Sequence, residues 1–286
     1  MSCYNRREAT LKCLDSIYRQ IDSPDYRFNI FLVDDGSTDG TAALVTHRYP
    51  EVKIISGDGS LFWNGGMRLA WLKARQVNHD FYLWVNDDAV LKPDAFAVLM
   101  KTHQNILLHS HRHALIVGAM IDPHSGRQTY GGLIKEKSRF SLRFMLLPIQ
   151  DTAQRCDTLN GNCVLVPLAV VEKVGILSSD FRHALGDYDY GLRACAAGFG
   201  CWVAPGILGE CSRNASTGAW FDPNLPFRER RQAIAHPKGR PVLEWLTFVG
   251  RHAGATVMVI AWIKLELSLL FPSLWKRLRL LRGRDD

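Results

Sequence analysis

The chain has 286 residues, of which 47% are hydrophobic and 22% are charged, a composition typical of a globular α/β protein and unlike that of a disordered chain. Its formal net charge is +7, but 12 basic and 5 acidic residues lie from Phe227 onward, and the residues before it carry 23 of each sign. A basic excess confined to the tail does not indicate a nucleic-acid-binding protein.

The first half of the sequence repeats one unit, in which helices alternate with apolar strands that end in acids. Leu11, Leu14 and Tyr18 recur at helical spacing, which predicts an amphipathic helix over residues 7–20. FNIFLVDDGSTDGT then predicts a strand and an acidic turn, VKIIS a strand, MRLAWLKARQ a helix, and DFYLWV a strand. This alternation predicts an α/β fold with a mixed, mainly parallel sheet flanked by helices.

The second half of the sequence follows the same pattern less regularly. ALIVGAMI, NCVLVP and CWVAPG predict strands, and a helix is expected after GDYDY. In open sheets of this kind, ligands bind beyond the carboxyl ends of the strands, where Asp34, Asp35, Asp87 and Asp88 all fall. We therefore expect the binding site at this edge of the sheet.

Asp87 and Asp88 are candidate ligands of a divalent metal. Two adjacent carboxylates repel one another unless a cation lies between them, and a site with few carboxylates, completed by a substrate's phosphates, is typical of Mg²⁺ or Mn²⁺. The alternative for an isolated NDD is a turn and a helix cap. DDGSTDG lacks the closing Glu of an EF-hand, and GDGSLFWNGG contains no G-x-G-x-x-G, so neither a calcium loop nor a dinucleotide fold is supported.

Four motifs carry a resemblance to a known family. CYNRRE, VDDGSTDGT, WVNDDAVLKP and GDYDYGLRACAAGF lie in this order within residues 3–205 and resemble the motifs of family 2 glycosyltransferases, which have the GT-A fold of nucleotide-diphosphosugar transferases. The resemblance implies a UDP-, GDP- or dTDP-linked sugar donor, a divalent metal, and inversion at the anomeric carbon. It also implies transfer, as by a rhamnosyl- or galactosyltransferase, to a glycan or lipid-linked glycan in surface polysaccharide (O-antigen) synthesis.

The resemblance assigns roles residue by residue. Tyr4 and Asn5 would lie against the nucleoside, and Asp35 would accept a hydrogen bond from the base. Asp87 would approach the ribose or the metal, and Asp88 would ligate the metal that bridges both phosphates. The residues expected to bind the nucleotide sugar are Tyr4, Asn5, Arg6, Asp34, Asp35, Trp63, Asn64, Gly65 and Asp87.

Asp187 in GDYDY is the expected general base, which removes the proton from the acceptor hydroxyl. Asp189, two residues later, is the second candidate or an acceptor-binding group. The alternative for Asp187 is a helix N-terminal acid whose pKa the macrodipole lowers, which would weaken it as a base. Gly186 is a departure, since many relatives carry Glu or Asp at this position.

SLFWNGGM predicts a glycine-rich loop with two open interpretations. Phe62 and Trp63 could stack on a sugar ring, while Asn64, Gly65 and Gly66 let the backbone approach the donor. Alternatively, the two aromatic side chains pack in the core.

Two further departures from the family pattern concern the first strand and the metal site. Relatives usually place a buried strand before the YNR turn, whereas almost nothing precedes Cys3 here, so the first strand is expected to be truncated. Many relatives also supply a late histidine ligand. No histidine follows VAPG closely, and His236 is a distant candidate that more simply reads as a loop residue.

The tail differs from the rest of the chain, which predicts a catalytic domain over residues 1–226 and a basic amphipathic helical extension over residues 227–286. Its longest apolar stretch ends at Lys264, short of the ~20 residues that span a bilayer, and no signal peptide opens the chain. Trp, Leu and Arg together favour a helix in an anionic membrane interface over one packed on the domain. We expect a cytoplasmic protein. If the tail helix lies in the membrane interface, the protein is peripheral at the inner face of the cell membrane.

Two other functions compete with glycosyl transfer. A sugar-phosphate nucleotidyltransferase would need a glycine-rich, basic loop after the first strand, which CYNRRE does not supply. A non-catalytic sugar-nucleotide-binding or membrane scaffold stays open. The seven cysteines are scattered and never form C-x-x-C, which indicates reduced thiols and argues against a zinc or redox site.

Overall fold

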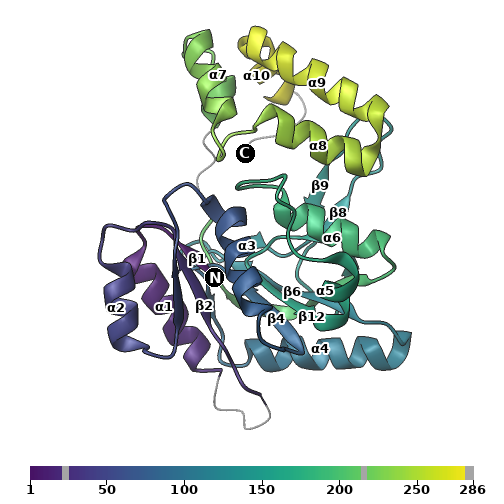
Figure 1. Cartoon of the computed structure of the whole chain (residues 1–286). Helices are drawn as coiled ribbons and strands as arrows, with labels where there is room; N and C mark the ends of the chain where they lie inside the picture. Colours follow the sequence, from purple (N-terminus) through teal and green to yellow (C-terminus); the bar gives the residue numbers. More distant parts are fainter. Residues whose placement is uncertain (21–25, 214–217, 281–286) are drawn as a thin grey trace. The chain divides into compact units, whose positions relative to one another are not determined.

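The computed structural model describes residues 1–20, 26–213 and 218–280 (Figure 1). Its contacts divide the chain into a first unit, Met1–Lys135 with Phe144–Arg213, and a second unit, Glu136–Arg143 with Asn214–Asp286. The composition suggested that the tail starts at residue 227, whereas the contacts place Asn214 already in the second unit. The boundary of the catalytic domain at residue 226 stays a prediction. The end of the predicted basic tail, residues 281–286, lies outside the described residues.

The first unit has an α/β fold, as predicted from the alternating pattern. Its described helices are α1 (Arg7–Tyr18), α2 (Thr41–Arg48), α3 (Phe62–Ala74), α4 (Ala95–Ser110), α5 (Leu168–Val174) and α6 (Gly186–Ala196). Its described strands are β1 (Ser2–Cys3), β2 (Phe31–Asp34), β3 (Lys53–Ser56), β4 (Phe81–Val85), β5 (Val90–Leu91), β6 (Ala114–Ile121), β7 (Gln128–Tyr130), β8 (Gly132–Lys135), β9 (Phe144–Leu146), β10 (Gln154–Cys156), β11 (Thr158–Leu159), β12 (Cys163–Pro167) and β13 (Gly200–Glu210). The bounds of α1, β3, β4 and β6 follow the predicted segments closely.

A small parallel sheet, in the order β1-β2-β3, forms the N-terminal part of the first unit. Helix α1 buries Leu11, Leu14 and Ile17, the apolar stripe that its sequence spacing predicted. Helix α3 packs against β1 and β2, while α1 and α2 lie together on the other side (Figure 1). Strand β1 contains two residues, Ser2 and Cys3, and both pair with the end of β2; the expected truncation of the first strand stays a prediction.

A seven-stranded sheet follows, in the order β10-β13-β6-β12-β4, with β5 paired to β13 and β7 to β6. Among the described strands, parallel pairing is confined to β1–β2, β2–β3 and β6–β13. The sheets are mixed as predicted, but "mainly parallel" was wrong for the larger one. In this sheet β12 runs antiparallel to both of its neighbours, β6 and β4, and β13 runs antiparallel to β10 and β5, so its one parallel pair among the described strands is β6–β13.

The start of α3 corrects another expectation, because residues 62–66 were predicted to form a glycine-rich loop. They form the first turns of the helix instead. The buried carboxylate of Asp35 explains this start: its Oδ2 accepts a hydrogen bond from Phe62 N (3.1 Å) and its Oδ1 one from Gly59 N (2.9 Å). A carboxylate at a helix N-terminus satisfies free N–H groups and interacts favourably with the helix dipole.

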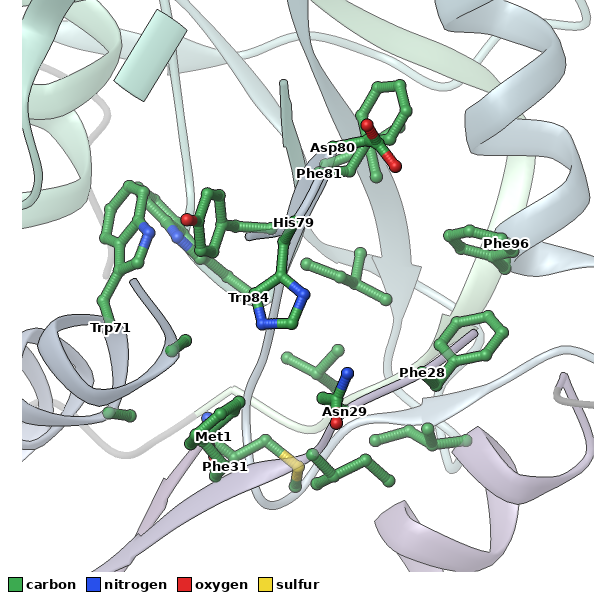
Figure 2. A pocket seen from close by; sticks show the side chains of 18 of the residues that line it. Met1, Phe28, Asn29, Phe31, Trp71, His79, Asp80, Phe81, Trp84 and Phe96 are labelled. Atoms are coloured by element: carbon green, nitrogen blue, oxygen red, sulfur yellow. Dashed lines mark hydrogen bonds between the residues drawn. The ribbon is translucent and has the colours of Figure 1, made fainter. Parts of the chain in front are cut away.

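A cavity of about 560 Å³ opens between β2 and β4, which do not pair with each other (Figure 2). Phe31, the first residue of β2, and His79, just before β4, lie on its wall together with Trp71 and Trp84. Strand β1 lies beside β2 only at Val33 and the next residue, and the cavity occupies the space next to the earlier part of β2. The cavity thus borders β2 at its amino end and β4 along its whole length, whereas the acids follow the carboxyl ends of both strands.

The second unit is mainly helical from residue 218 onward, whereas its other segment, Glu136–Arg143, contains no helix or strand. It contains the 3₁₀ helix η1 (Gly218–Phe221) and the helices α7 (Phe227–Ala235), α8 (Val242–Ala253), α9 (Ala255–Leu270) and α10 (Pro272–Leu280). Its core joins Trp220 and Ile234 to Leu265 and Leu269 of α9, and Arg230 Nη2 donates to Leu269 O (2.9 Å). None of the described helices is alone long and apolar enough to cross a membrane, but α9 and α10, bent by 115°, meet that requirement together.

Candidate functional site

The predicted acid pair lies directly after β4, and a cation from the chain itself contacts it. Arg6, in the turn between β1 and α1, places Nη1 2.5 Å from Asp88 Oδ2 and 3.3 Å from Asp87 Oδ1. The site residues Arg6, Asp87 and Asp88, separated by about 80 positions in the sequence, are therefore neighbours in the fold. The guanidinium reduces the repulsion between the two carboxylates.

Asp87 is the more buried of the two acids. Its Oδ2 is buried and has no hydrogen-bond partner among the described residues. Burial raises the pKa of Asp87 to about 7, an effect that Arg6 opposes and that the charge of Asp88 reinforces. An unpartnered buried carboxylate oxygen is costly, which indicates that this side of the site is built for a further positive group.

The two other predicted acids fix the loops after β2 and β3: the Asp34 side chain bonds within the first loop, and the Asp35 side chain joins the first loop to the second. Asp34 Oδ1 accepts a hydrogen bond from Ser37 N (2.9 Å), and both acids are buried. Asp35 uses its two oxygens to fix residues 57–62 and the start of α3. A Cβ carbon on Gly57 would stand 2.5 Å from Asp35 Oδ1, so the carboxylate and this loop approach very closely.

Tyr4 and Asn5 form a turn above these loops. The backbone of Asn5 is left-handed (φ 49°), and its Oδ1 accepts a hydrogen bond from Thr38 N (2.7 Å) while its own N–H donates to Ser37 Oγ (2.9 Å). Tyr4 is 53% exposed. An exposed aromatic ring on a turn fixed at both sides is suited to stack on a flat ligand.

Trp63 lies beside the acid pair on the first turn of α3. Its Nε1 donates a hydrogen bond to Asn86 Oδ1 (2.7 Å), and Asn86 directly precedes the acids. The ring covers Gly161 so closely that a Cβ carbon on this glycine would lie 2.5 Å from it. Trp63 thus packs against the hydrophobic core and is half-buried, while Phe62 lies edge-on to His183.

The segment between β11 and β12 connects the acid pair to the predicted base, a role that the sequence did not reveal. Gly161 N donates to Asp187 Oδ2 (2.9 Å), and the next residue, Asn162, accepts at its carbonyl oxygen from Asn86 N (3.1 Å). Two consecutive residues therefore link Asp187 at the start of α6 to the end of β4. The one sequence signal for a role of this Asn-Gly-Asn segment in the site is its position directly before a predicted strand.

Asp187 lies in the first turn of α6, half-buried, so that part of its surface reaches solvent. Burial raises the pKa of this carboxyl to about 6, although hydrogen bonds from the backbone of Gly161 and Tyr188 act in the opposite direction. The direction of this shift is opposite to the one that the alternative of a helix-stabilised N-terminal acid implies. A carboxylate with such a pKa is mostly ionised at neutral pH and a stronger base than a free Asp.

Asp189 is not brought to the site. Its side chain is fully buried, and its Oδ2 accepts a hydrogen bond from Arg193 Nε (2.7 Å). The same guanidinium donates to the carbonyl oxygens of Val174 and Ile176. The arrangement fixes the end of α5 to α6 and does not expose a carboxylate to an acceptor.

Asn64 and Gly65 also make contacts inside the protein and do not face the site. Asn64 is fully buried, and its Nδ2 donates to Ser178 O (2.8 Å) and Phe181 O (2.5 Å). Gly65 N donates to Arg182 O (3.3 Å). Both residues hold the segment that precedes α6 and thereby the position of Asp187.

Cys211, directly after β13, is a further neighbour of the acids that the sequence did not single out. Its Sγ donates to Asp88 Oδ1 (3.3 Å) and accepts from Asn162 Nδ2 (3.3 Å). Burial raises the pKa of this thiol, so it stays a neutral donor. Thr129 Oγ1 donates to its carbonyl oxygen (2.8 Å), which fixes the segment beyond β13.

The residues present fit a divalent ion. Asp87 and Asp88 offer adjacent carboxylates, and one buried oxygen lacks a partner. Within residues 1–20, 26–213 and 218–280, no three His, Cys, Asp or Glu side chains are grouped to hold a metal. His236 lies in the second unit, directly after α7, where its Nδ1 accepts from Lys238 N (3.2 Å). An ion at this site would therefore depend on phosphate and water oxygens for its remaining ligands.

A family model described as glycosyl transferase family 2 matches residues 1–149, just over half of the chain, including β1 to β9 and the acid pair. The chain belongs to glycosyl transferase family 2. The resemblance carried by the four sequence motifs is confirmed. No curated protein sequence matches the chain significantly.

Solved structures of other proteins share the fold. Staphylococcus aureus TarS residues 1–349 aligns with a TM-score of 0.52 and 16% identity, over 88% of this chain and 69% of that one. A longer TarS chain from the same organism aligns with a TM-score of 0.52 and 17% identity, over 88% of this chain and 42% of its own length. GalNAc-T7, solved with UDP, GalNAc and Mn²⁺, aligns with a TM-score of 0.56 and 11% identity, over 73% of this chain and 42% of that one. The predicted GT-A fold of this family 2 glycosyltransferase is confirmed.

Proposed function

We propose that this family 2 glycosyltransferase moves a hexosyl group from a nucleotide-diphosphate sugar to a glycan or lipid-linked glycan, with inversion, in surface polysaccharide synthesis. One observation carries the proposal. The consecutive residues Gly161 and Asn162 bond Asp187 on one side and the backbone before Asp87 and Asp88 on the other. A base and a charge-binding pair are thereby held at a fixed separation, which a displacement between them requires.

The donor would lie along the carboxyl ends of β2 and β4. Tyr4 would stack on the base, and Asp34 and Asp35 fix the loops around it. The TarS fragment has been solved in complex with UDP-GlcNAc and with UDP, which supports a nucleotide-sugar donor for the shared fold. UDP-, GDP- and dTDP-linked sugars all remain candidates, because no contact of the described residues singles out one base or sugar.

The diphosphate would lie at the acid pair. Asp88 and Asp87 would hold Mg²⁺ or Mn²⁺, which when bound would act as a Lewis acid for the departing diphosphate. The distant GT-A neighbour GalNAc-T7, solved with Mn²⁺, supports this choice of cofactor. Two hydrogen bonds help to orient the acids. Trp63 Nε1 holds Asn86, the residue before Asp87, and Cys211 Sγ donates to Asp88 Oδ1.

Asp187 would act as the general base. Its Oδ2 is held by Gly161 N and its Oδ1 by Tyr188 N, so the carboxylate has a fixed direction and lone pairs left for the acceptor hydroxyl. With a pKa of about 6 it would accept the hydroxyl proton as the sugar is displaced from the diphosphate. The acceptor oxygen would attack the face of the anomeric carbon opposite the leaving group, which gives inversion.

We also propose that the second unit holds the enzyme at an anionic membrane surface, at the inner face of the cell membrane. Large apolar side chains are exposed along α9 and α10, close to the basic residues Lys276 and Arg277. The exposed set is Val259, Trp262, Ile263, Leu267, Leu270, Phe271, Leu274 and Leu278. A helix surface of Trp, Leu and Phe beside Lys and Arg is suited to a lipid interface, where a lipid-linked acceptor would be found.

A donor screen tests the proposal. UDP-, GDP- and dTDP-sugars would be incubated with the protein with and without Mn²⁺, and release of the nucleoside diphosphate would be measured. We expect metal-dependent release from one donor, lost in Asp187→Asn and Asp88→Ala. Nucleotide binding without release from any donor, also with glycan acceptors present, would favour the non-catalytic sugar-nucleotide-binding scaffold.

A further inference from the structure

Arg6 occupies the position in the acid pair where a positive charge is needed. A single nitrogen, Nη1, lies between Asp87 Oδ1 at 3.3 Å and Asp88 Oδ2 at 2.5 Å. The side chain of Arg6 is 37% exposed, against 9% for Asp87 and 18% for Asp88. The acids are thus set into the protein, and the guanidinium covers them from the solvent side.

The contact of Arg6 with Asp88 is incompatible with a metal on the same oxygen. A guanidinium nitrogen at hydrogen-bond distance and an ion at coordination distance would occupy overlapping space and repel each other. Asp87 Oδ2 shows that Arg6 does not satisfy the pair completely, since this buried oxygen has no partner in the described part of the chain. The acid pair therefore has the Arg6 guanidinium as its present counter-charge, and Asp87 Oδ2 is left to bind a divalent ion.

Arg6 is placed where it can leave the acids. It is the residue before α1, with φ −135° and ψ 43°, and its side chain does not cap the helix. Its neighbour Arg7 points elsewhere, with Nη1 donating to Asp39 O (3.1 Å) and Nε to Glu8. The contacts of Arg6 Nη1 with the acids come from the end of a long side chain that is 37% exposed, so they can be exchanged by side-chain rotation while the backbone at the start of α1 stays in place.

We propose that Arg6 is an internal counter-cation that competes with the divalent ion for Asp87 and Asp88 and turns to the donor's diphosphate when the ion is bound. The inference rests on the metal-diphosphate site proposed above. In the empty enzyme, Arg6 neutralises the acids. Once displaced, its planar guanidinium offers paired N–H donors that match two phosphate oxygens. Arg6 is thus a positioning residue for the diphosphate and sets how tightly the empty site holds metal.

Mn²⁺ binding without nucleotide tests the competition, measured by electron paramagnetic resonance of the free ion on the full chain. Arg6→Gln should bind Mn²⁺ about tenfold more tightly than the unchanged protein, because the competing cation is gone. Arg7→Gln, which removes the same charge one residue away, should leave the affinity within about twofold. Arg6→Lys keeps a charge but not the planar fork and should give a smaller increase than Arg6→Gln.

A second titration separates the two roles of the residue. At saturating Mn²⁺, Arg6→Gln should bind UDP about tenfold more weakly, while Arg7→Gln binds it normally. Mn²⁺ affinity in Arg6→Gln and Arg6→Lys that is equal to or below that of the unchanged protein would overturn the inference, and their thermal unfolding shows that both are folded. If the unchanged protein, Arg6→Gln and Asp88→Ala all fail to bind Mn²⁺, the proposed metal site itself is wrong.

Discussion

Gly186 and Asn64 meet at a contact that leaves no room for a side chain on the glycine. A Cβ carbon added to Gly186 would collide with Asn64 Oδ1. Asn64 cannot yield, because its Nδ2 is bonded to Ser178 O and Phe181 O inside the protein. The glycine at the position where many relatives carry an acid is therefore a packing requirement of this chain, and it fixes the start of the helix that carries Asp187.

Gly186→Ala should lower the free energy of unfolding by about 1–3 kcal/mol, the typical effect of an added methyl group in a closed site. Gly65→Ala is the matched control, because its added Cβ would lie 3.4 Å from Leu61 Cβ, an ordinary contact. In helix α3 that substitution should be neutral or stabilising by up to about 1 kcal/mol. Urea denaturation measures both, and equal effects would remove the packing explanation.

Asp187→Asn should reduce turnover by about 10²–10⁴-fold while donor affinity stays within about twofold. The amide keeps the size of the side chain but cannot take a proton, and with one acceptor oxygen it keeps only one of the two backbone hydrogen bonds, so thermal unfolding is measured alongside turnover. Asp189→Asn is the comparison, because this buried acid is bonded to Arg193 and should lower stability by about 3 kcal/mol instead of selectively stopping chemistry. Single-turnover kinetics and calorimetric donor binding distinguish the two. Normal turnover in Asp187→Asn would place the base elsewhere.

The pH dependence of turnover should report the raised pKa of Asp187. A general base acts only when deprotonated, so at saturating Mn²⁺, which would keep the ligand Asp87 ionised, the rate should fall about tenfold per pH unit below a pKa of about 6 and level off above it. A free Asp would place this inflection near pH 4. Asp189→Asn, at a temperature where it stays folded, should keep the same inflection. An inflection near pH 4 would show that burial does not control this carboxyl in the working enzyme.

Sequence patterns predicted the parts of the site that depend on local chemistry. Apolar runs that end in acids placed Asp35, Asp87 and Asp88 correctly at strand ends, because the period of a strand and the end of its apolar stretch are local properties. Their partners were not predictable: the contact of Arg6 with the acid pair spans about 80 residues, and one sequence does not show which distant loop closes a charge pair.

The predictions for Asn64 and Asp189 show the same limit. Both are polar residues next to expected binding motifs, and a polar residue near a site is a reasonable ligand candidate. The fold buries both, one bonded to the backbone before α6 and the other to Arg193. Both side chains are buried because α3, α5 and α6 pack together, and the local sequence pattern around each residue does not reveal this packing. The start of α3 at Phe62 was missed for a related reason, because its cap comes from Asp35 in another loop.

UDP, GDP or dTDP should bind at least tenfold more tightly with Mn²⁺ than without it, because Asp87 and Asp88 would otherwise face phosphates of like charge. Isothermal titration calorimetry of each nucleotide with and without the ion measures this difference. Asp88→Ala should abolish the dependence on Mn²⁺. Asp58→Ala, which removes an exposed acid whose side chain accepts hydrogen bonds from Ser60, should keep it. Equal affinities with and without Mn²⁺ for every nucleotide would remove the metal from the mechanism.

The apolar surface of α9 and α10 should bind vesicles that contain anionic lipid. Trp262 and Phe271 are 47% and 55% exposed, and replacing both by Ser should release the full chain from sedimenting vesicles of phosphatidylglycerol and phosphatidylcholine. Leu108→Ser on α4, where the leucine is 71% exposed, is the matched control and should leave binding unchanged. Substitution is preferable to truncation, because Leu265 and Leu269 of α9 belong to the core of the second unit. Binding to neutral vesicles alone would contradict the role of Lys276 and Arg277, and no binding at low salt would leave these helices without a membrane function.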